Sequence, residues 1–569
     1  MSTVVPLHSA PDLPPSDDPL DGLTAVSLGM VPPDGALLAA EDPYHLLANG
    51  FTPWRKLGGE LVVSVDRPAG IRAAQAHYGR DDLVFTRCAP DDLRHVLHFA
   101  FGPELAQNAR ERCPEADSCR SLQGGLSRGK GLLAVAGFAV LFYALPYAVI
   151  SAMLIVLALL SLATTLMRGT ALIAGWAGDA NLPEDVPMIA GYKDVPVISV
   201  LIPLLREERM ASQILEAVSA LDYPKDRLDI KLVLENDDDI THAALAGEPL
   251  PDWVEIISVP EDTLRTKPRA MNYALHFCRG EIVGIYDAED RPEPSQLRRV
   301  AAYLAHADEE VACVQGFLDF YNTKQNWLSR CFTIEYAIWF RVLLHGCQRL
   351  GLPIPLGGTT VFFRRTVLEE IGAWDAHNVT EDADLGMRLV RRGYRCDVLP
   401  TTTFEEANCR ALPWVKQRSR WLKGYAMTWA THMRDPARLW HDLGPKGFCA
   451  FQILFMGAIA AYLATPLFWV LWTGFFGLGL VPWDHLPGPV LAFFYGALLA
   501  GQITMVSVAL RAVWAKERRH LVKWVFSLPF YWPLGALAGY KALFELFTKP
   551  FYWDKTEHGR SLGTGFDEP

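Results

Sequence analysis

The chain has 569 residues, half of them hydrophobic, and a net charge of −11 at neutral pH. This length exceeds one ordinary core, so two or three domains are expected, and that hydrophobic fraction beside 117 charged side chains (53 basic plus 64 acidic) indicates soluble domains joined to membrane segments. The acidic balance and the lack of an arginine-rich face argue against a nucleic-acid partner, and the ten cysteines lack the paired spacings of a metal site, so reduced, packed thiols are expected.

The N-terminal segment has the composition of a flexible tail. Residues 1–40 are rich in Pro, Asp and Ser and lack the basic-then-apolar pattern of a signal peptide. We therefore predict a disordered tail that begins in the cytoplasm. Residues 41–115 then form a small α/β unit, in which Leu61–Val65 is a predicted strand.

The first hydrophobic region, residues 130–174, is predicted to be a transmembrane hairpin. Residues 132–167 contain no charge, and Lys130 and Arg168 bracket them. Since about 20 residues cross a bilayer once, this stretch suits nearly two crossings, and Pro146 lies where the turn would fall. One long tilted helix is the alternative, but it would place the bracketing basic residues on opposite sides of the membrane.

Residues 175–446 form a soluble segment in which apolar runs alternate with helical patterns. Val197–Ile202, Ile230–Leu234 and Glu281–Tyr286 have the continuous hydrophobicity of buried parallel strands. In a parallel α/β sheet, ligands bind outside the carboxyl ends of the strands. The residues that follow each strand are therefore where we expect the chemistry.

Acidic residues follow the second of these strands. Glu235, Asp237, Asp238 and Asp239 come where the strand ends. A carboxylate at this sheet edge could accept hydrogen bonds from a nucleobase or a ribose. The pattern does not single out which of these carboxylates would do so.

Charged residues also flank the third strand. Lys267 and Arg269 precede a helical pattern and could contact a phosphate, although such a basic loop is often only solvated. Asp287, Glu289 and Asp290 follow the strand directly. Grouped oxygen ligands suit a hard divalent cation, which would neutralise a diphosphate, while a solvated acidic turn is the alternative. Because two acidic clusters repel each other unless cations intervene, a polar, cation-dependent ligand is expected.

A further motif, Thr380-Glu381-Asp382, stands ahead of a helical run. Thr380 can cap that helix, and acidic side chains are favourable in a first helical turn. A structural capping role and a chemical role are therefore equally supported by the motif alone.

The run Gln417-Arg418-Ser419-Arg420-Trp421 lies shortly before the second hydrophobic region. On a helix, Gln417, Arg420 and Trp421 share one face because they are spaced i, i+3 and i+4. An amide, a guanidinium and an indole there could bind a sugar hydroxyl, a phosphate and the face of a sugar ring. A basic amphipathic helix at a membrane surface explains the arginines but not the shared face.

The second hydrophobic region, residues 447–546, is predicted to hold transmembrane and interfacial helices. Its charge-free stretches are 447–483, 486–510 and 524–540. The first is expected to cross once with part of it at the interface, and the second to return, since the basic residues within 511–523 belong on the cytoplasmic side. The third, broken by Pro529 and Pro533, suits a short hairpin or a re-entrant segment. In all, roughly four to six crossings are expected.

Taken in order, these motifs resemble those of family 2 glycosyltransferases of the cellulose-synthase and hyaluronan-synthase kind, over about residues 170–556. Asp287 and Glu289 match the metal motif of that family, and Asp290 is a further candidate ligand because Glu289 stands where the strict pattern has Asp. Thr380-Glu381-Asp382 matches its TED motif, and the run from Gln417 to Trp421 matches its QxxRW motif.

The resemblance implies an α/β GT-A-type (Rossmann-like) catalytic domain at residues 175–446, inserted between transmembrane α-helices and facing the cytoplasm. It implies transfer with inversion at the anomeric carbon, building and exporting an exopolysaccharide from a nucleotide-sugar donor, with UDP-glucose as the first expectation by analogy. Asp382 would be the general base, with Glu381 beside it. A divalent cation, Mg²⁺ or Mn²⁺, would be held by the acidic residues after the third strand and would stabilise the departing diphosphate.

The resemblance also implies the binding residues and the surroundings of the enzyme. The donor would be bound by Glu235, Asp237, Lys267, Asp287 and Arg420. Trp421 and Gln417 would hold the acceptor. Besides donor and acceptor, the partners would be the bilayer and export or regulatory proteins, with no nucleic acid, in a multi-pass protein of a bacterial-type inner (plasma) membrane.

The two ends of the chain carry weaker resemblances. Residues 41–115 are similar in order to the N-terminal domain of type II secretion ATPases, which in some proteins binds cyclic di-GMP. The arginine-leucine-glycine repeats of that binding are not evident, so a docking or regulatory role without nucleotide is expected. Residues 547–569 are expected to be cytoplasmic, and Phe551–Gly559 is similar to the gating-loop region of the synthases.

Two other functions fit parts of the pattern. The first is a non-processive transferase that adds one sugar to a lipid carrier. The second is a transporter or a scaffold without catalysis, which would need charged side chains along a path through the membrane. The hydrophobic segments hold almost none, so the transferase function is favoured.

Overall fold

The computed structural model describes residues 19–124, 128–176, 195–207, 211–475 and 485–552. The chain divides into two compact units between residues 107 and 108.

The N-terminal unit is a three-stranded sheet with helices packed against it. Its strands lie in the order β1-β2-β3, and β2 pairs antiparallel with β1 and parallel with β3. The elements are α1 (Gly35–Leu38), α2 (Pro43–Asn49), β1 (Phe51–Leu57), β2 (Glu60–Val65), α3 (Pro68–Tyr78), β3 (Val84–Arg87) and α4 (Pro90–Glu111), which runs into the second unit. The predicted strand at Leu61–Val65 is confirmed as part of β2.

Residues 19–40, expected to belong to a disordered tail, instead contribute to this unit. Leu28 is fully buried, and its backbone N–H donates to Asp92 at 3.1 Å. Ala25 forms a bridge with Arg87 of β3, and the Asp34 side chain caps α1. Composition alone concealed these contacts, because one or two buried leucines and a cap are enough to fix a short polar segment.

The second unit is built on an eight-stranded mixed sheet in the order β6-β5-β4-β7-β10-β9-β11-β8. Its strands are β4 (Ile198–Leu204), β5 (Leu228–Glu235), β6 (Val254–Val259), β7 (Ile282–Ile285), β8 (Arg291–Pro292), β9 (Val311–Phe320), β10 (Val361–Arg364) and β11 (Arg395–Glu405). β4 pairs in parallel with both β5 and β7, which confirms the three predicted parallel strands. The carboxyl ends of these strands therefore meet at one edge of the sheet.

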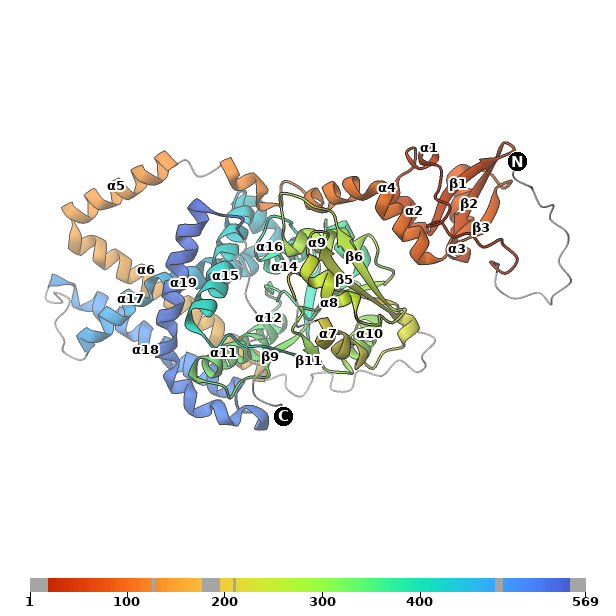
Figure 1. Ribbon diagram of the computed structural model, residues 1–569. Helices are drawn as coiled ribbons and strands as arrows, with labels where there is room; N and C mark the ends of the chain where they lie inside the picture. The colour runs from red at the N-terminus through yellow and green to blue at the C-terminus, as the bar shows by residue number, and fades with distance from the viewer. Residues whose placement is uncertain (1–18, 125–127, 177–194, 208–210, 476–484, 553–569) are drawn as a thin grey trace. The chain divides into compact units, whose positions relative to one another are not determined.

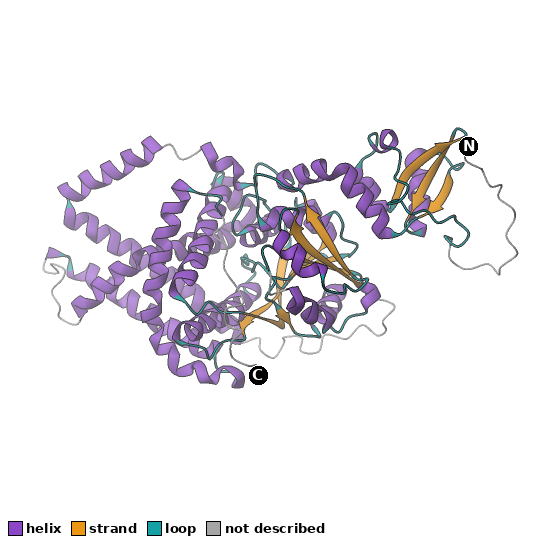
Figure 2. Ribbon diagram, in the orientation of Figure 1, coloured by secondary structure: helices purple, strands orange, loops and turns teal. Residues whose placement is uncertain are grey.

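Helices pack on both faces of this sheet (Figure 2). β5 is buried along its whole length, and β4 at all but one position, which explains their uninterrupted apolar sequence. The helices are α7 (Ala211–Ser219), α8 (Asp239–Ala246), α9 (Lys267–Leu275), α10 (Gln296–His306), α11 (Trp327–Ala337), α12 (Leu344–Arg349), α13 (Arg365–Glu370), α14 (Glu381–Arg391) and α15 (Ala411–His432).

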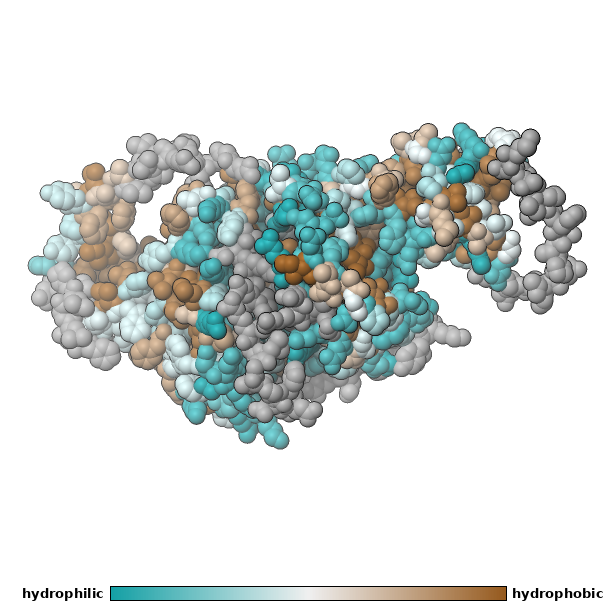
Figure 3. All heavy atoms as spheres, in the orientation of Figure 1, coloured by the Kyte–Doolittle hydropathy of each residue, from teal (hydrophilic) through white to brown (hydrophobic). Residues whose placement is uncertain are grey.

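Hydrophobic helices of the second unit lie together beside the sheet, namely α6 (Pro146–Trp176), α17 (Ala458–Phe475), α18 (Gly488–Ala512) and α19 (Leu528–Thr548) (Figure 1). The preceding helix α5 (Arg128–Ala144) contacts α6, and α16 (Pro436–Phe451) packs against α14. Among the described residues, three helical stretches are long and apolar enough to cross a membrane, namely Pro146–Gly175, Pro436–Val470 and Gly488–Ala512. The space-filling view shows hydrophobic residues gathered where α5 and α6 lie (Figure 3). The number of crossings stays a prediction.

Two details of the predicted membrane segments can be compared with the structure. The turn expected at Pro146 separates α5 from α6, which are unequal at 17 and 31 residues. The stretch 524–540 was expected to form a short hairpin or a re-entrant segment. From Leu528 onward it belongs to one continuous helix, α19, so it forms no hairpin, and its re-entrant placement stays a prediction. Pro529 lies in its first turn, where backbone N–H groups have no helical partner, and Pro533 removes one hydrogen bond without ending the helix.

Candidate active site

One cavity joins the carboxyl edge of the sheet to the hydrophobic helices. Its volume is about 910 Å³. Leu204, Glu235 and Asp287, at or just after the ends of β4, β5 and β7, line it on one side. Residues of α6, α17, α18 and α19 line it on the other. The expected ligand edge of the sheet thus opens toward the hydrophobic helices.

The acidic turn after β7 presents two carboxylates to this cavity. Asp287 and Glu289 line it, whereas Asp290 does not. The Oδ2 atom of Asp290 accepts a hydrogen bond from the backbone N–H of Asp287 at 2.8 Å and another from the Thr359 hydroxyl. Burial and the charges of Asp287 and Glu289 raise the pKa of Asp290 well above its usual value. Asp290 therefore fixes the shape of the turn, while Asp287 and Glu289 face the cavity.

Lys267 is a cation close to the cavity carboxylates after β7 and at the start of α14. It is the first residue of α9, whose first turn Thr266 caps, and its Nζ donates to Asp287 at 2.5 Å and to the Gly358 carbonyl at 2.8 Å. Burial lowers the pKa of Lys267, but Asp287, Glu381 and Asp382 outweigh burial and the net shift is upward. Lys267 therefore stays charged where the acidic motifs converge.

The acidic residues after β5 separate into different roles. Glu235 lines the cavity and accepts hydrogen bonds from Arg269, each at 3.1 Å. Burial, only partly offset by Arg269, raises the pKa of Glu235. Asp237 is not a lining residue and pairs at 2.5 Å with Arg265, which is one. Asp238 is buried and caps α8 through Thr241.

The position of the Arg269 side chain differs from the expectation based on the sequence. It was paired with Lys267 as a candidate phosphate contact, but its side chain is fully buried. It holds Glu235 and the Pro260 carbonyl instead. The reason is the helical geometry of α9, because residues two positions apart point in different directions on a helix.

The oxygen ligands after β7 fit a divalent cation. Among the described residues, no three acidic, histidine or cysteine side chains are arranged to hold a metal ion by themselves. Mg²⁺ commonly takes one or two carboxylates and completes its shell with substrate phosphates, and Asp287 and Glu289 supply such a pair. Glu405, at the end of β11, lines the cavity beside them, and burial together with the charges of this turn raises its pKa well above the usual value.

Glu381 and Asp382 begin α14 and line the same cavity. Thr380 occupies the capping position without a side-chain capping bond, while the Asp382 carboxylate accepts from the Ala383 N–H at 2.8 Å. Burial and the charge of Asp382 raise the pKa of Glu381 to about 7, and burial also raises the pKa of Asp382. Of the two roles that the motif left open, side-chain capping by Thr380 is therefore not observed. The two carboxylates form a pair that readily holds a proton.

Two glycines allow the motifs to approach each other. A Cβ on Gly358 would lie 3.2 Å from the Asp382 Oδ2 atom, and one on Gly424 would lie 2.2 Å from the Thr380 hydroxyl oxygen. Gly358 belongs to the segment that enters β10, and Gly424 belongs to α15. The acidic start of α14 is thus enclosed between that segment and the helix that carries the aromatic motif.

The face predicted on α15 lies in the cavity. Gln417, Arg420 and Trp421 all line it. The Gln417 Oε1 atom accepts from Asn408 at 2.9 Å, and the charge of Arg420 acts on both Glu381 and Asp382, lowering their pKa against the effect of burial. The structure therefore brings the TED and QxxRW residues to one site, where the Trp421 ring lies near Tyr336 of α11.

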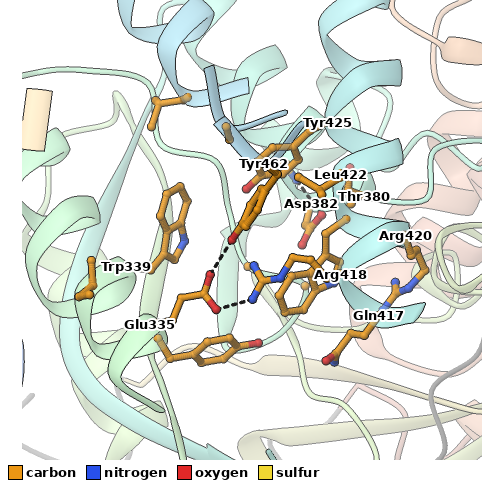
Figure 4. A pocket seen from close by; sticks show the side chains of 18 of the residues that line it. Glu335, Trp339, Thr380, Asp382, Gln417, Arg418, Arg420, Leu422, Tyr425 and Tyr462 are labelled. Carbon is orange, nitrogen blue, oxygen red and sulfur yellow. Dashed lines mark hydrogen bonds and ion pairs between the residues drawn. The ribbon is translucent and has the colours of Figure 1, made fainter. Parts of the chain in front are cut away.

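The sequence reasoning missed a polar cluster behind this face (Figure 4). Arg418, placed off the predicted face, also lines the cavity and pairs with Glu335 of α11 at 2.6 Å. Its guanidinium carbon lies 4.5 Å from the centre of the Trp421 ring. Glu335 also accepts from Tyr462 at 3.1 Å and from Tyr531 at 2.6 Å. No sequence motif surrounds Glu335. The one sign of its role in the sequence is that it is an acidic residue within an apolar helical pattern.

Lys423 fixes the chain just after α19. Its Nζ donates to the Tyr552 carbonyl at 2.7 Å and pairs with Glu545 at 3.3 Å. Phe551 packs near Val379, which directly precedes Thr380. The rest of the segment likened to a gating loop, residues 553–559, lies outside the described residues.

Comparison with known proteins agrees with this site. Residues 196–424 match the family model described as "Glycosyltransferase like family 2". The chain is 31% identical over 241 residues to a probable glycosyltransferase, YdaM, of Bacillus subtilis, covering 41% of this chain and 56% of that protein. It is 27% identical over 321 residues to a β-monoglucosyldiacylglycerol synthase of Synechocystis, covering 53% of this chain and 64% of that protein.

A plant relative extends the range of similar proteins. A glucomannan 4-β-mannosyltransferase of Arabidopsis thaliana is 24% identical over 295 residues, which is 49% of this chain and 52% of that protein. The chain spans about half to two thirds of the length of these relatives.

Proposed function

Because residues 196–424 form a glycosyltransferase family 2 (GT-A) domain, we propose that the chain transfers a sugar from a nucleotide-sugar donor to an acceptor hydroxyl within the cavity. The observation that carries this proposal is the continuity of one cavity from the carboxylates of β7 and α14 to the hydrophobic helices. A donor can lie at the sheet edge while the acceptor reaches the same atoms from the side of the helices.

The base in the proposed reaction is Asp382. The acceptor oxygen bonds to the anomeric carbon, its proton passes to the Asp382 carboxylate, and the nucleoside diphosphate leaves from the opposite side, so the configuration inverts. Glu381 shares a proton with Asp382, which is consistent with their raised pKa values.

A divalent cation, Mg²⁺ or Mn²⁺, would be held by Asp287 and Glu289, and when bound it would supply positive charge to the departing diphosphate. Lys267 and Arg420 add positive charge on the same side of the cavity. Glu235, which lines the cavity, would contact the nucleoside, and Asp237 would act through Arg265. Asp290 holds the turn in shape.

The acceptor in the first candidate function is a growing polysaccharide. Trp421 would stack on the terminal sugar ring and Gln417 would hydrogen-bond a hydroxyl. Aromatic side chains continue along the cavity from this point, where Trp339, Trp469 and Trp532 line it. Sugar rings stack on such side chains, so a polymer can be held over several residues.

The acceptor in the second candidate function is a lipid that receives one sugar. Aliphatic side chains share the same wall, with Leu157, Leu160 and Leu498 facing the cavity. The Synechocystis relative is named for a glucosyl lipid. This candidate function needs the same base and the same donor site. It differs only in the acceptor that enters the cavity from the side of the hydrophobic helices.

The proposal also covers the surroundings of the site. Residues 41–115 would act as a docking or regulatory unit, residues 130–174 and 447–546 would lie in or on a bacterial-type inner membrane in several passes, and residues 175–446 would face the cytoplasm. UDP-glucose is the first donor to test, by analogy only.

Full-length protein in lipid nanodiscs, given a panel of radiolabelled nucleotide sugars, tests the proposal. Released nucleoside diphosphate identifies the donor, and the size of the labelled product identifies the acceptor. Polymer of increasing length supports the first candidate, and one sugar per lipid supports the second. Turnover of no nucleotide sugar would refute both.

A further inference from the structure

Arg168 is a basic residue among the hydrophobic-helix residues that line the cavity. It lies on α6, within the apolar stretch Pro146–Gly175, and lines the cavity. Within the described residues it makes no hydrogen bond or ion pair, and the ionisable groups that act on it are Glu335 and Tyr462. An arginine enclosed by apolar helices is costly unless an anion meets it.

The charges around Arg168 do not balance. Glu335 is the acidic residue that lines this part of the cavity, and Arg418 already pairs with it at 2.6 Å (Figure 4). Glu335 also accepts hydrogen bonds from the hydroxyls of Tyr462 and Tyr531. One positive charge, that of Arg168, is left facing the cavity.

A polar stripe on α6 leads away from this cation. It consists of Thr165, Thr164 and Ser161, which lie three, four and seven positions before Arg168 in the sequence. All three line the cavity. Their hydroxyls donate to backbone carbonyls, so their oxygens remain able to accept hydrogen bonds from a ligand.

The walls beside this stripe are apolar. Leu157 and Leu160 of α6, Phe468 of α17 and Leu498 of α18 line the cavity there. This combination is matched by an amphiphile with an anionic head and apolar chains. It is less well matched by a nucleotide, whose base and ribose need polar contacts along their whole length.

A simpler explanation for Arg168 is that basic residues collect at the cytoplasmic ends of membrane helices. That rule accounts for an arginine near the end of α6. It does not account for a side chain that lines an internal cavity between helices while making no ion pair. An arginine that served only as an anchor would be expected to extend toward lipid headgroups or water.

The geometry points to a binding site for an anionic lipid in this half of the cavity, with its phosphate on Arg168, its polar linker along the α6 hydroxyls and its chains between α6, α17 and α18. This inference rests on the proposed function, because it names the chemical class of the acceptor that enters the cavity from the side of the hydrophobic helices. In the second candidate function the lipid is the acceptor itself, and in the first it is the primer on which the polymer begins.

Lipid binding to the purified full-length protein in detergent tests the inference. Native mass spectrometry would count bound dioleoyl phosphatidic acid, with dioleoylglycerol as the neutral lipid of identical chains. We expect wild type to hold phosphatidic acid at one saturable site. Arg168→Gln should weaken that binding about tenfold or more, because a charge-assisted contact is lost, and Arg168→Lys should restore part of it. Dioleoylglycerol binding should not respond to either change.

Two controls separate this site from others. Arg519→Gln removes an exposed arginine outside the cavity and should leave phosphatidic acid binding unchanged. Arg168→Gln should still bind nucleoside diphosphate, which shows that the variant is folded and that its donor site is intact.

Several results would overturn the inference. They are phosphatidic acid binding that ignores Arg168→Gln, binding of inorganic phosphate as tight as that of the lipid, or displacement of the lipid by nucleoside diphosphate, which would place Arg168 in the donor site. Failure of the proposed function looks different, because wild type would then turn over no nucleotide sugar at all, whatever lipid it binds.

Discussion

Replacing Arg418 with glutamine should weaken acceptor binding while leaving the donor site intact. The change removes the partner of Glu335, and both side chains are largely enclosed, with 11% and 15% of their surfaces exposed. Breaking a buried pair from one side costs about 3–5 kcal/mol, and we expect the lower end because Tyr462 and Tyr531 still donate to Glu335. The guanidinium contact with Trp421, at 4.5 Å, contributes a further amount on the order of 0.5–2 kcal/mol.

Thermal unfolding and acceptor titration of the purified protein measure both effects. For Arg418→Gln we expect a stability loss of about 3 kcal/mol and an acceptor KM roughly tenfold higher. Adding Glu335→Gln should recover stability relative to Arg418→Gln alone, because no enclosed charge is then left unpaired. Arg330→Gln is the matched control, since Arg330 lies over Trp524 and does not line the cavity. Strictly additive losses in the double variant, or a rise confined to the donor KM, would refute the reasoning.

The remaining predictions of this group concern the acidic half of the cavity. Gly424→Ala should lower turnover and thermal stability, because the added Cβ would lie 2.2 Å from the Thr380 hydroxyl oxygen, whereas Gly496→Ala, with nothing within 4 Å, should change neither. Turnover should rise with pH up to about 7, where the Glu381–Asp382 pair gives up its proton, and Glu381→Gln should remove that limb of the pH profile. Over the same window, from the ordinary value of 4.5 to about 7, stability should fall as pH rises, because the folded state binds the Glu381 proton more tightly than the unfolded chain does. Excess EDTA should abolish turnover and added Mg²⁺ or Mn²⁺ should restore it, while full activity in EDTA would argue against a cation at Asp287 and Glu289.

The parallel strands and the acidic motifs could be predicted because their signals are local. A strand buried on both faces has a continuous apolar sequence, as β4 and β5 do, and parallel strands direct their carboxyl ends to one edge. Asp287, at that edge after β7, and Asp382, at the start of a helix, therefore fell into one cavity. The shared face of Gln417, Arg420 and Trp421 could also be predicted, because helical spacing is a local signal.

The remaining features depend on contacts between segments far apart in the chain. Arg269 looked equivalent to Lys267 in sequence, yet one is buried against Glu235 and the other faces the cavity. The partner of Arg418 lies 83 positions away on α11, and no spacing rule connects the two. Arg168 looked like a simple boundary of a hydrophobic stretch, because only the packing of the helices shows which way it faces.

The most direct test of the central claim is single-turnover transfer by Asp382→Asn, measured beside nucleoside diphosphate binding by the same protein. The substitution keeps the size of the side chain but removes the base, whose contribution is typically about 100-fold to 10,000-fold. We expect the rate of transfer to fall by about 100-fold or more, while nucleoside diphosphate binding stays close to that of wild type. Wild-type transfer by this variant would contradict the assignment of Asp382, and with it the proposal that donor and acceptor meet at this point of the cavity.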